Sequence, residues 1–464
     1  MNHMRDTVET AIASKMAERN ISARAIEHFL SCRRAIQEQG TQGDQIQWDE
    51  INPFGDADVM QMDQSEEEVK GCTALGEENL RRIVVIKLNG GRSTSMGGAV
   101  PKCFVKAKDQ MSFLDIAMKR IMTLNDQFKT EIPLVLMNSF FTDQKTAKIV
   151  GRTPLLIMDF IQNEYPRLIA EDLSLLDSGT EEDWCPAGHG DFYISFYESG
   201  LLGQLLDLGY RWVFLSNIDN LCADVSPCLL GLMLQGGHDF MMEVVRKTAV
   251  DVKGGAPAFI KGYPGLLEIA QVAAEHEKDF QDINKFRYFN TNNLWIDMEA
   301  IRDKIESGSL NMPTILNPKK ILDKNVIQVE TAMGAAMGSF ANPAAIAVPR
   351  SRFFPVKKMK DLLILQSDTF FMDDHYQILP NDKRPKDFSF LPEVVFDHGF
   401  MGTNELDDCF ADPATLSLVQ AESLTVKGDV FFEKNVTIKG KVELSQHGDE
   451  QLRIPEGTVL GDEK

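Results

Sequence analysis

The sequence lacks any apolar run long enough to cross a membrane. A transmembrane helix needs about 20 predominantly apolar residues, and the 464-residue chain contains no such stretch. Its beginning, MNHMRDTVETAIASKMAERN, is interrupted by charges and has no apolar segment of the kind found in secretory signal peptides. We therefore expect a protein without a membrane-spanning helix or a secretory leader.

Paired cysteines are missing as well. The seven cysteines are scattered along the chain and form no Cys-x-x-Cys pair. This spacing argues against a disulfide framework and against a zinc site. Free thiols are typical of proteins in the reducing cytosol, so we expect a cytoplasmic protein.

Positive charge is scarce. The chain has 48 lysines and arginines against 69 aspartates and glutamates, which gives a formal net charge of −21. A chain of this charge repels nucleic acid and anionic membranes, so neither is expected as a partner. A phosphate ligand would need local basic residues and backbone amides set against a negative background.

The apolar pattern predicts three successive regions. Residues 1–80 begin with helical periodicity and continue into an acidic, broken linker. In residues 81–380, short apolar runs alternate with helical patterns, which predicts an α/β domain with a mostly parallel sheet. Ligands of such sheets bind at the carboxyl ends of the strands. A glycine-rich loop at Asn89 and the sequence SNIDN, from Ser216 to Asn220, both lie at such ends.

Residues 381–464 show a six-residue apolar period. Two series of apolar residues hold this spacing: Leu424, Val430, Val436 and Val442, and Val426, Phe432, Ile438 and Leu444. The period is typical of a β-helix with three short strands per coil. An ordinary meander of alternating strands is the other interpretation. Because two series keep the same spacing over four repeats, the β-helix is favoured over the meander. About two coils leave an end that a second subunit could cover, so we expect a homo-oligomer through this region.

The stretch KLNGGRSTSMGGAVPK, from Lys87 to Lys102, follows the apolar run IVVI. Glycines after a buried strand let the backbone approach a ligand, and their N–H groups can bind phosphate. The spacing matches neither GxGxxG nor the P-loop. Because Pro101 restricts the backbone before Lys102, this lysine can be held as a phosphate contact. From composition alone, a solvated surface loop is an equally good interpretation.

This glycine-rich stretch and eight further motifs resemble the UTP–glucose-1-phosphate uridylyltransferase (UDP-glucose pyrophosphorylase) family. The further motifs are, in chain order, PLVLMNSFFT, CPAGHGDFY, FLSNIDNL, MEVVRKTAVDVKGG, LLEIAQV, FNTNNLWI, QVETAMGAA and VPRSRFFPVK. The resemblance covers nearly the whole chain from Ile83 onward. It implies a Rossmann-like nucleotidyltransferase catalytic domain over residues 81–380 and a C-terminal left-handed β-helix over residues 381–464.

The resemblance implies that UTP and glucose 1-phosphate react to give UDP-glucose and pyrophosphate. The sugar phosphate would attack the α-phosphorus in line, and it needs no general base because it is already an anion. The barrier is then mostly alignment and repulsion between anions, which Mg²⁺ and lysines lower. A pyrophosphorylase of other or broader sugar specificity stays open as an alternative. So does a catalytically weak nucleotide-sugar binding scaffold, favoured only by Arg92-Ser93 where the family has Leu-Gly.

The resemblance also implies roles for individual residues. Lys102 and Lys357 correspond to the catalytic lysines, and Asp219 corresponds to the Mg²⁺ ligand. The implied nucleotide contacts are Leu88, Asn89, Gly90, Gly91, Lys102, Gln162, Gly188, Asp219 and Lys357. The implied sugar-phosphate contacts are Gly90, Gly91, His189, Lys253, Glu268, Asn290, Thr291 and Asn292.

Two of these assignments also have support from local sequence. Gly188 and Gly190 flank His189, which suggests that a ligand approaches closely there. Alternate residues of a strand point the same way, so Asn290 and Asn292 are expected to face one hexose. An isolated Asp such as Asp219 is more often a turn or helix cap, and only its motif favours the metal.

Overall fold

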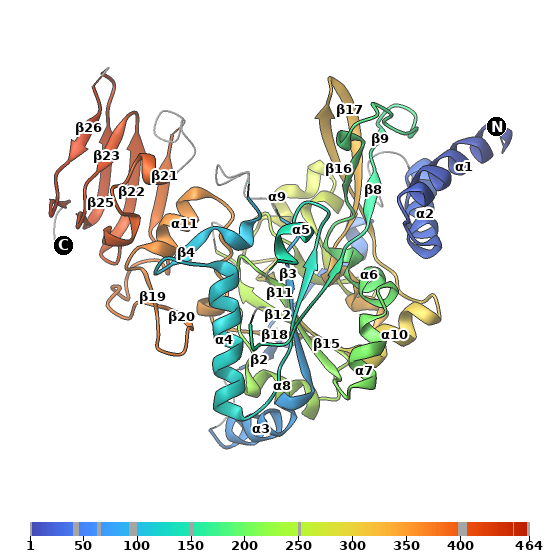
Figure 1. Cartoon of the computed structure of the whole chain (residues 1–464), viewed down its shortest axis with the longest axis horizontal. Helices are drawn as coiled ribbons and strands as arrows, with labels where there is room; N and C mark the ends of the chain where they lie inside the picture. The colour runs from blue at the N-terminus through green and yellow to red at the C-terminus, as the bar shows by residue number, and fades with distance from the viewer. Residues whose placement is uncertain are drawn as a thin grey trace. The chain divides into compact units, whose positions relative to one another are not determined.

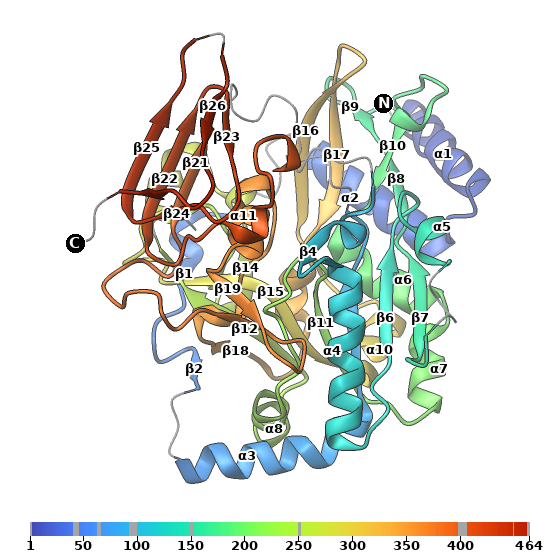
Figure 2. The same ribbon diagram turned by 60° about the vertical axis from the view of Figure 1, so that its left-hand side comes forward.

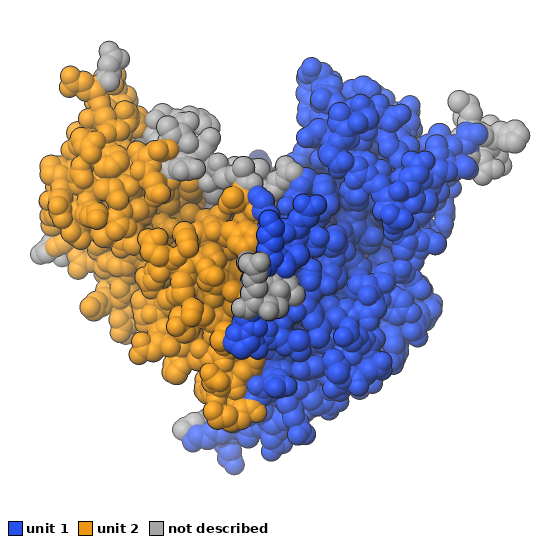
Figure 3. All heavy atoms as spheres, viewed as in Figure 1, with its two compact units in different colours: residues 1–90, 130–216, 225–348 blue, residues 91–129, 217–224, 349–464 orange. Residues whose placement is uncertain are grey.

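The computed structural model describes residues 2–39, 46–62, 66–91, 100–148, 153–248, 252–397, 406–448 and 450–461. Arg92 and Ser93 lie outside these residues. Within the described ranges, no helix is both long and apolar enough to span a membrane. The chain forms two compact units, coloured in Figure 3: unit 1 comprises residues 1–90, 130–216 and 225–348, and unit 2 comprises residues 91–129, 217–224 and 349–464.

Unit 1 is built around an eight-stranded sheet (Figure 1). Its strands, in spatial order, are β2 (Met60–Gln61), β18 (Pro343–Ala347), β12 (Phe240–Arg246), β15 (Tyr288–Asp297), β11 (Trp212–Asn217), β3 (Ile83–Leu88), β6 (Leu134–Asn138) and β7 (Ile157–Ile161). The pairs β2–β18, β18–β12, β3–β6 and β6–β7 are parallel, whereas β15 runs antiparallel to β11 and β12. The predicted α/β fold with a mostly parallel sheet is thus confirmed.

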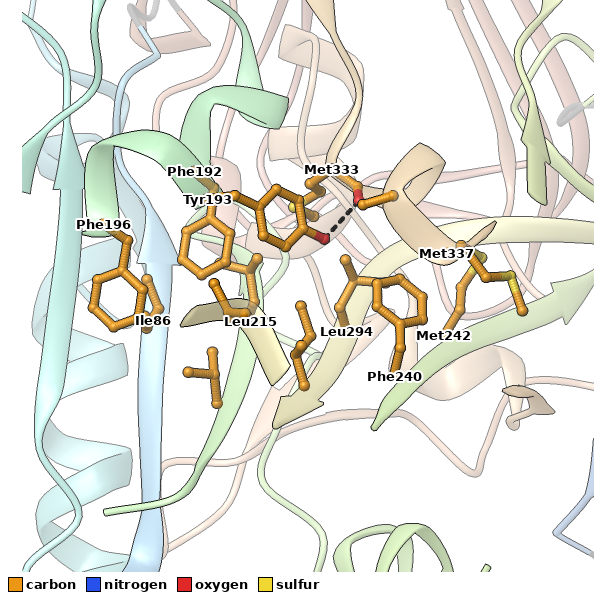
Figure 4. Packing of buried hydrophobic residues seen from close by; sticks show 14 of the residues in the cluster. Ile86, Phe192, Tyr193, Phe196, Leu215, Phe240, Met242, Leu294, Met333 and Met337 are labelled. Atoms are coloured by element: carbon orange, nitrogen blue, oxygen red, sulfur yellow. Dashed lines mark hydrogen bonds between the residues drawn. The ribbon is translucent and has the colours of Figure 1, made fainter. Parts of the chain in front are cut away.

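The inner strands β3 and β6 of the sheet are buried because helices cover it. All five residues of β6 are buried, as are the first five of β3, which is typical of a parallel strand covered on both faces. In Figure 4, side chains of α6 (Phe192–Glu198) pack close to those of β3 and β11, among them Phe196 and Ile86. The Tyr193 hydroxyl donates to the Met333 carbonyl oxygen at 2.8 Å, which fixes the segment η9 (Met333–Ser339) to this core.

Other helices of unit 1 complete its core. They are α3 (Glu66–Asn79), α5 (Asp143–Thr146), α7 (Leu201–Asp207), α8 (Pro227–Gln235), α9 (Glu277–Phe280) and α10 (Met298–Glu306). The helices α3 and α8 approach so closely that a Cβ atom at Gly76 would lie 1.8 Å from the Pro227 carbonyl oxygen. Glycine is therefore required at this contact.

The N-terminal helices α1 (Asn2–Glu18) and α2 (Ala23–Gln39) occupy the stretch for which the sequence predicts helical structure. They bury Ile12, Met16 and Phe29 in a core shared with smaller sheets of unit 1. These sheets are β8 (Glu164–Pro166) with β10 (Trp184–Pro186), and β9 (Leu168–Ile169) with β17 (Lys324–Thr331) and β16 (Thr314–Ile321). A further sheet of β1 (Ile51–Pro53), β13 (Ala256–Ile260) and β14 (Tyr263–Leu267) packs in a core of its own.

Unit 2 begins with segments that belong to the central part of the sequence. They are η4 (Lys102–Phe104), the hairpin of β4 (Lys106–Lys108) and β5 (Met111–Ser112), α4 (Phe113–Phe128), η10 (Arg350–Arg352), α11 (Met359–Gln366) and the hairpin of β19 (Phe370–Met372) and β20 (Ile378–Pro380). Residues 217–224 also belong to this unit.

The C-terminal part of unit 2 consists of short parallel sheets (Figure 2). One sheet contains β21 (Glu393–Phe396), β22 (Ala421–Lys427) and β25 (Gly440–Ser445). A second consists of β23 (Val430–Phe432) and β26 (Leu452–Ile454), and a third of β24 (Thr437–Ile438) and β27 (Val459–Leu460). Most of the predicted inward residues are buried, with exposed fractions of at most 1% for Leu424, Val426, Val430, Phe432, Val436 and Ile438. Leu444 is only partly buried.

Candidate active site

Three residues from separate segments of unit 2 meet at one carboxylate. The Nζ atoms of Lys102 and Lys357 each lie 2.8 Å from Oδ2 of Asp219. Lys102 also donates to the Val356 carbonyl oxygen at 3.3 Å. Lys102 and Asp219 are buried, whereas the side chain of Lys357 is 52% exposed. We call these three residues the lysine cluster; the structure brings together the residues that the sequence motifs associate with phosphate chemistry.

Backbone contacts explain why the cluster forms. The Val356 N–H donates to the Asp219 carbonyl oxygen at 3.0 Å, which places Lys357 beside the SNIDN turn. The Asn220 side chain accepts from the Phe354 N–H at 3.0 Å and donates to the Arg352 carbonyl oxygen at 3.3 Å. Asn220 therefore joins two segments that are remote in sequence. We did not assign it a role from the sequence, although it lies in the quoted motif.

The two ammonium groups decide the charge state of Asp219. Burial alone would raise the pKa of this carboxyl group, but Lys357 and Lys102 outweigh burial and lower the pKa below its ordinary value. Asp219 therefore stays anionic at neutral pH. Its second oxygen, Oδ1, is buried and has no hydrogen-bond partner among the described residues.

The open oxygen of Asp219 suits a hard cation. Mg²⁺ is usually bound through one or two carboxylates and completes its shell with water and phosphate oxygens. Within the part of the chain that the structure describes, no group of three or more His, Cys, Asp or Glu side chains could hold a metal ion. A metal at Asp219 would thus depend on the phosphates of a bound nucleotide, which fits a cofactor that arrives with its substrate.

In unit 1, Gly90 and Gln162 lie against one another. A Cβ atom at Gly90 would stand 2.1 Å from Nε2 of Gln162, so a larger residue here would displace the end of the Gln162 side chain. The Ser139 hydroxyl donates to the Gly90 carbonyl oxygen at 2.8 Å, and Gln162 N–H donates to the Asn138 carbonyl oxygen at 2.9 Å. The amide of Gln162 has no hydrogen-bond partner among the described side chains and backbone groups, so it can still pair with a flat base.

Neighbouring residues of the glycine loop have other surroundings. The buried Asn89 amide donates to Asn138 Oδ1 at 2.8 Å and to Thr146 Oγ1 at 3.2 Å, so its side chain supports the loop from within. Leu88 packs against the main core of unit 1. In unit 2, a Cβ atom at Gly91 would meet no atom within 4 Å among the described residues.

The glycines beside His189 lie close to β17, and a ligand contact at Gly188 stays a prediction. A Cβ atom at Gly190 would stand 2.3 Å from Thr331 Oγ1, and one at Gly188 would stand 3.2 Å from the Thr331 carbonyl oxygen. Both glycines therefore make room for β17. Nδ1 of His189 accepts from the Met333 N–H at 3.0 Å, which orients the partly exposed ring.

Asn290 and Asn292 lie together, but an irregular strand brings them there. Asn292 has a left-handed backbone with φ of 59°, and the pairing of β12 with β15 shifts its register beside it. The Asn290 amide donates to Asn292 Oδ1 at 2.9 Å, and the Asn292 N–H donates back to Asn290 Oδ1 at 2.9 Å. Thr291 is only 1% exposed, and its hydroxyl donates to the Glu243 carbonyl oxygen, so its side chain lies within the strand pair and its contact with the sugar stays a prediction.

Glu268 lies beside this asparagine pair. A Cβ atom at Gly255 would stand 2.5 Å from Oε1 of Glu268, and the Asn290 N–H donates to the Gly255 carbonyl oxygen at 2.9 Å. Burial raises the pKa of Glu268 to about 7, and the ammonium of Lys247 offsets only part of this effect.

The two lysines of this region differ in burial. Lys247 is 6% exposed, and its Nζ atom lies 4.2 Å from the centre of the Phe280 ring. Lys253 is exposed, and the described residues give it no ion pair or hydrogen bond. Sequence reasoning assigned Lys253 to the sugar phosphate and overlooked Lys247, although both lie in the motif MEVVRKTAVDVKGG. The buried lysine is the one that affects Glu268.

Comparisons with known proteins cover nearly the whole chain. Residues 26–439 match the family described as UTP–glucose-1-phosphate uridylyltransferase. A Schizosaccharomyces pombe protein named probable UTP–glucose-1-phosphate uridylyltransferase is 35% identical over 471 residues, which cover 99% of this chain and 90% of that protein. The Solanum tuberosum UTP–glucose-1-phosphate uridylyltransferase is 40% identical over 392 residues, which cover 82% of this chain and 80% of that protein.

Solved structures agree. The crystal structure of a Trypanosoma brucei UDP-glucose phosphorylase has a TM-score of 0.84 and 31% identity, and covers 98% of this chain and 99% of that chain. A variant of the Leishmania major UDP-glucose pyrophosphorylase in complex with UDP-glucose has a TM-score of 0.84 and 30% identity, and covers 98% of both chains. The chain therefore belongs to the UTP–glucose-1-phosphate uridylyltransferase family.

Proposed function

We propose that this protein transfers uridylate from UTP to glucose 1-phosphate, which forms UDP-glucose and releases pyrophosphate. Membership of the family supports this reaction, because relatives that match over most of the chain carry the name of this enzyme. The observation that carries the proposal is the lysine cluster, in which two ammonium groups lie 2.8 Å from one carboxylate oxygen. A reaction between two anions requires such a concentration of cations.

In the proposed mechanism, the two lysines act on charge rather than on protons. A phosphate oxygen of glucose 1-phosphate is already anionic, so it attacks the α-phosphorus of UTP without a general base, and pyrophosphate leaves on the opposite side. The ammonium groups of Lys102 and Lys357 exchange Asp219 for phosphate oxygens of the bound nucleotide. There they lower the repulsion between the reactants and stabilise the charge that develops on the leaving pyrophosphate.

We propose Mg²⁺ as the cofactor and Asp219 as the residue that holds it. The buried Oδ1 atom supports this assignment, because it is an acceptor without a donor among the described residues. When bound, Mg²⁺ supplies positive charge beside the phosphates of the nucleotide. Asp219 itself contributes an anionic oxygen that neighbouring cations keep deprotonated.

Residues of unit 1 are proposed to recognise the uracil ring and the hexose. The Gln162 amide and the peptide of Gly90 suit the edge of a uracil ring, which carries both donors and acceptors. Glu268 and the paired amides of Asn290 and Asn292 suit the hydroxyls of a hexose. Gly91, Gly188, His189 and Lys253 remain proposed contacts of the phosphates.

The C-terminal sheets are proposed to coil as a left-handed β-helix that joins subunits of a cytoplasmic homo-oligomer. Parallel pairing supports a coil, because Leu424 pairs with Val442, three six-residue periods further on. Deletion of residues 423–464 is expected to change the assembly state, measured as the mass in solution. An unchanged mass would contradict the role of this region in assembly.

The proposed reaction is tested by supplying nucleoside triphosphates and hexose 1-phosphates in all combinations, with Mg²⁺ and detection of pyrophosphate. UTP with glucose 1-phosphate is expected to give the highest kcat/KM. A comparable kcat/KM with galactose 1-phosphate would favour the broader sugar specificity left open by the sequence. Binding of UDP-glucose without pyrophosphate release from any combination would refute the reaction and favour a binding scaffold.

A further inference from the structure

Two charged side chains bind the two ends of helix α11. One is Asp361 of the helix itself, and the other is Lys108 at the end of β4. At its N-terminal end, Oδ2 of Asp361 accepts from the backbone N–H groups of Lys357, at 3.0 Å, and Lys358, at 2.8 Å. At its C-terminal end, Nζ of Lys108 donates to the carbonyl oxygens of Gln366, at 2.9 Å, and Ser367, at 2.6 Å. Figures 1 and 2 both show α11 beside β4, the strand that ends at Lys108.

The charges of these two side chains match the ends of the helix. A helix leaves N–H groups unpaired at its beginning and carbonyl groups unpaired at its end, and its dipole favours an anion at the first and a cation at the second. Charged hydrogen bonds of this kind are stronger than neutral ones. Burial lowers the pKa of Lys108 to about 8, while Asp109 and Asp368 oppose the shift, so the ammonium form is populated at neutral pH.

Both contacts lead to the lysine cluster. Asp361 binds the backbone of Lys357 itself. Lys108 ends the short segment that begins with η4 at Lys102, and a second bond, from Nε2 of Gln366 to the Lys106 carbonyl oxygen at 2.9 Å, joins the same segment to α11. The helix therefore connects the two candidate catalytic lysines by a route that does not pass through Asp219.

We propose that Asp361 and Lys108 are positioning residues that hold Lys102 and Lys357 in register through α11. This inference rests on the proposed function. Two ammonium groups at one carboxylate repel each other, and in the proposed reaction both leave Asp219 for phosphate oxygens. A connection that persists during this exchange keeps them close. The helix can supply it because four consecutive residues, Leu362 to Leu365, are buried and fix it in the core of unit 2.

The chain offers a matched control on another helix of unit 2. At the beginning of α4, Oδ2 of Asp115 accepts from the Ser112 N–H at 2.9 Å, and the Ser112 hydroxyl accepts from the Asp115 N–H at 3.2 Å. Asp115 thus caps its helix much as Asp361 caps α11. Among the described residues, Asp115 itself bonds to none of those proposed for substrate binding or catalysis, although its partner Ser112 pairs with Lys106 in the β4–β5 hairpin. Loss of the cap should lower the melting temperature by a similar amount in either helix.

The experiment compares Asp361→Ala, Asp361→Asn and Asp115→Ala in the full-length protein. Asp361→Ala is expected to lower kcat about 30-fold and to change the Kd for UTP less than threefold, because Lys357 loses its alignment but not its charge. Asp361→Asn keeps an acceptor oxygen and should recover most of kcat. Asp115→Ala should lower the melting temperature as Asp361→Ala does and leave kcat within twofold.

Lys108 is tested by Lys108→Met and Lys108→Arg, of which only the second keeps donors for the two carbonyl groups. Lys108→Met should lower kcat about tenfold, and Lys108→Arg should restore it. A readout independent of turnover is the labelling rate of the Lys357 amine by an acylating reagent, relative to that of Lys358. This ratio should change in Asp361→Ala and stay constant in Asp115→Ala.

Three results would overturn the inference in a wild-type protein that is active. They are an unchanged kcat in Asp361→Ala, a kcat loss in Asp115→Ala as large as that in Asp361→Ala, and a labelling ratio that no variant changes. Failure of the wild-type protein to release pyrophosphate would instead refute the proposed function. If Asp361→Ala does not fold, the comparison of Lys108→Met with Lys108→Arg decides in its place.

Discussion

Asp219 in unit 2 and Glu268 in unit 1 are carboxylates withdrawn from water, yet their pKa values move in opposite directions. Burial acts on both and favours the neutral acid. Two ammonium groups at 2.8 Å outweigh burial at Asp219, whereas Lys247 offsets only part of it at Glu268, whose pKa rises to about 7. The number and the closeness of the cations, rather than burial, therefore determine the charge of each carboxylate.

This difference suits two kinds of ligand. A carboxylate that remains ionised at neutral pH binds cations, which is the task proposed for Asp219 among phosphates. A carboxyl group that titrates near neutrality can accept hydrogen bonds when ionised and donate one when protonated. Glu268 can therefore bind hydroxyl groups of an uncharged sugar ring without placing a full negative charge in the region at every pH.

The largest expected effect is that of Asp219→Asn. The substitution keeps the shape of the side chain but removes the anion that holds both lysines, and it turns an amide N–H₂ group toward cations. We expect kcat/KM to fall about 10³-fold, equivalent to about 4 kcal/mol of transition-state stabilisation. Steady-state kinetics over a series of Mg²⁺ concentrations measures this fall in kcat/KM. The same experiment should show a weaker apparent Mg²⁺ affinity in Asp219→Asn than in the wild-type protein.

The matched variant for this test is Glu268→Gln, which also replaces a carboxylate with an amide. It should raise the KM for glucose 1-phosphate about tenfold and leave the apparent Mg²⁺ affinity unchanged. Equal losses of Mg²⁺ affinity in the two variants would contradict the assignment of the metal ion to Asp219 alone.

A smaller effect is expected of Lys357→Ala. The side chain is half-exposed, so its removal should leave the fold intact, and Lys102 still neutralises Asp219. We expect kcat to fall about 100-fold while the Kd for UTP changes less than tenfold, because the lost interaction is made mainly with the charge that develops in the reaction. Calorimetric binding of UTP alongside turnover separates the two quantities. Equal losses in both would mean that Lys357 binds the ground state only.

Linear motifs predicted the lysine cluster, whereas its support could not be read from the sequence. Lys102, Asp219 and Lys357 each lie in a motif with its own spacing. Lys108 resembles an ordinary surface residue in the sequence, since its role depends on a contact with Gln366, more than 200 residues away. Asp361 caps its own helix through Lys357 and Lys358, a local contact that the sequence analysis did not use. Nothing in local composition indicates which lysine will meet the end of a helix.

Backbone irregularities limited the prediction in a different way. The alternation of side chains in a strand placed Asn290 and Asn292 together, but it did not reveal the left-handed residue at Asn292 or the inward position of Thr291. The sequence indicated a close approach at glycines 188 and 190, and the fold shows β17 there, whereas a ligand contact at Gly188 stays a prediction. Sequence indicates that space is needed, and only the fold shows what fills it.

The six-residue period of the C-terminal region was a reliable guide to its inward residues. It holds in the pairing of Leu424 with Val442 and of Val426 with Leu444, and these strands are adjacent in the sheet. It fails further on, since Phe432 pairs with Ile454 instead of the residue that the period predicts. The connection between β25 and β26, residues 446–451, is longer than the corresponding connection between β22 and β23, residues 428–429, and such an insertion changes the register without changing the pattern of burial before it.

The smallest expected effect concerns the pH dependence of stability. The ordinary pKa of a glutamate, 4.5, applies to unfolded Glu268, and the folded value is about 7. Between these values the folded state binds more protons, so Glu268 lowers the free energy of unfolding as pH rises from about 4.5 to 7. For Asp219 the sign is opposite: its folded pKa is depressed, so its contribution is complete above the unfolded value and is lost only in acid.

Glu268→Gln should therefore gain stability relative to the wild-type protein as pH rises from 5 to 8. Because the side chain keeps some contact with water, we expect a gain of about 1 to 2 kcal/mol rather than the value of the full shift. Urea denaturation at several pH values measures the difference in the free energy of unfolding. Asp219→Asn serves as the control, since its difference from the wild-type protein should stay constant over the same range. A constant difference for Glu268→Gln as well would show that Glu268 is already ionised at pH 5 and that the two carboxylates do not differ as argued.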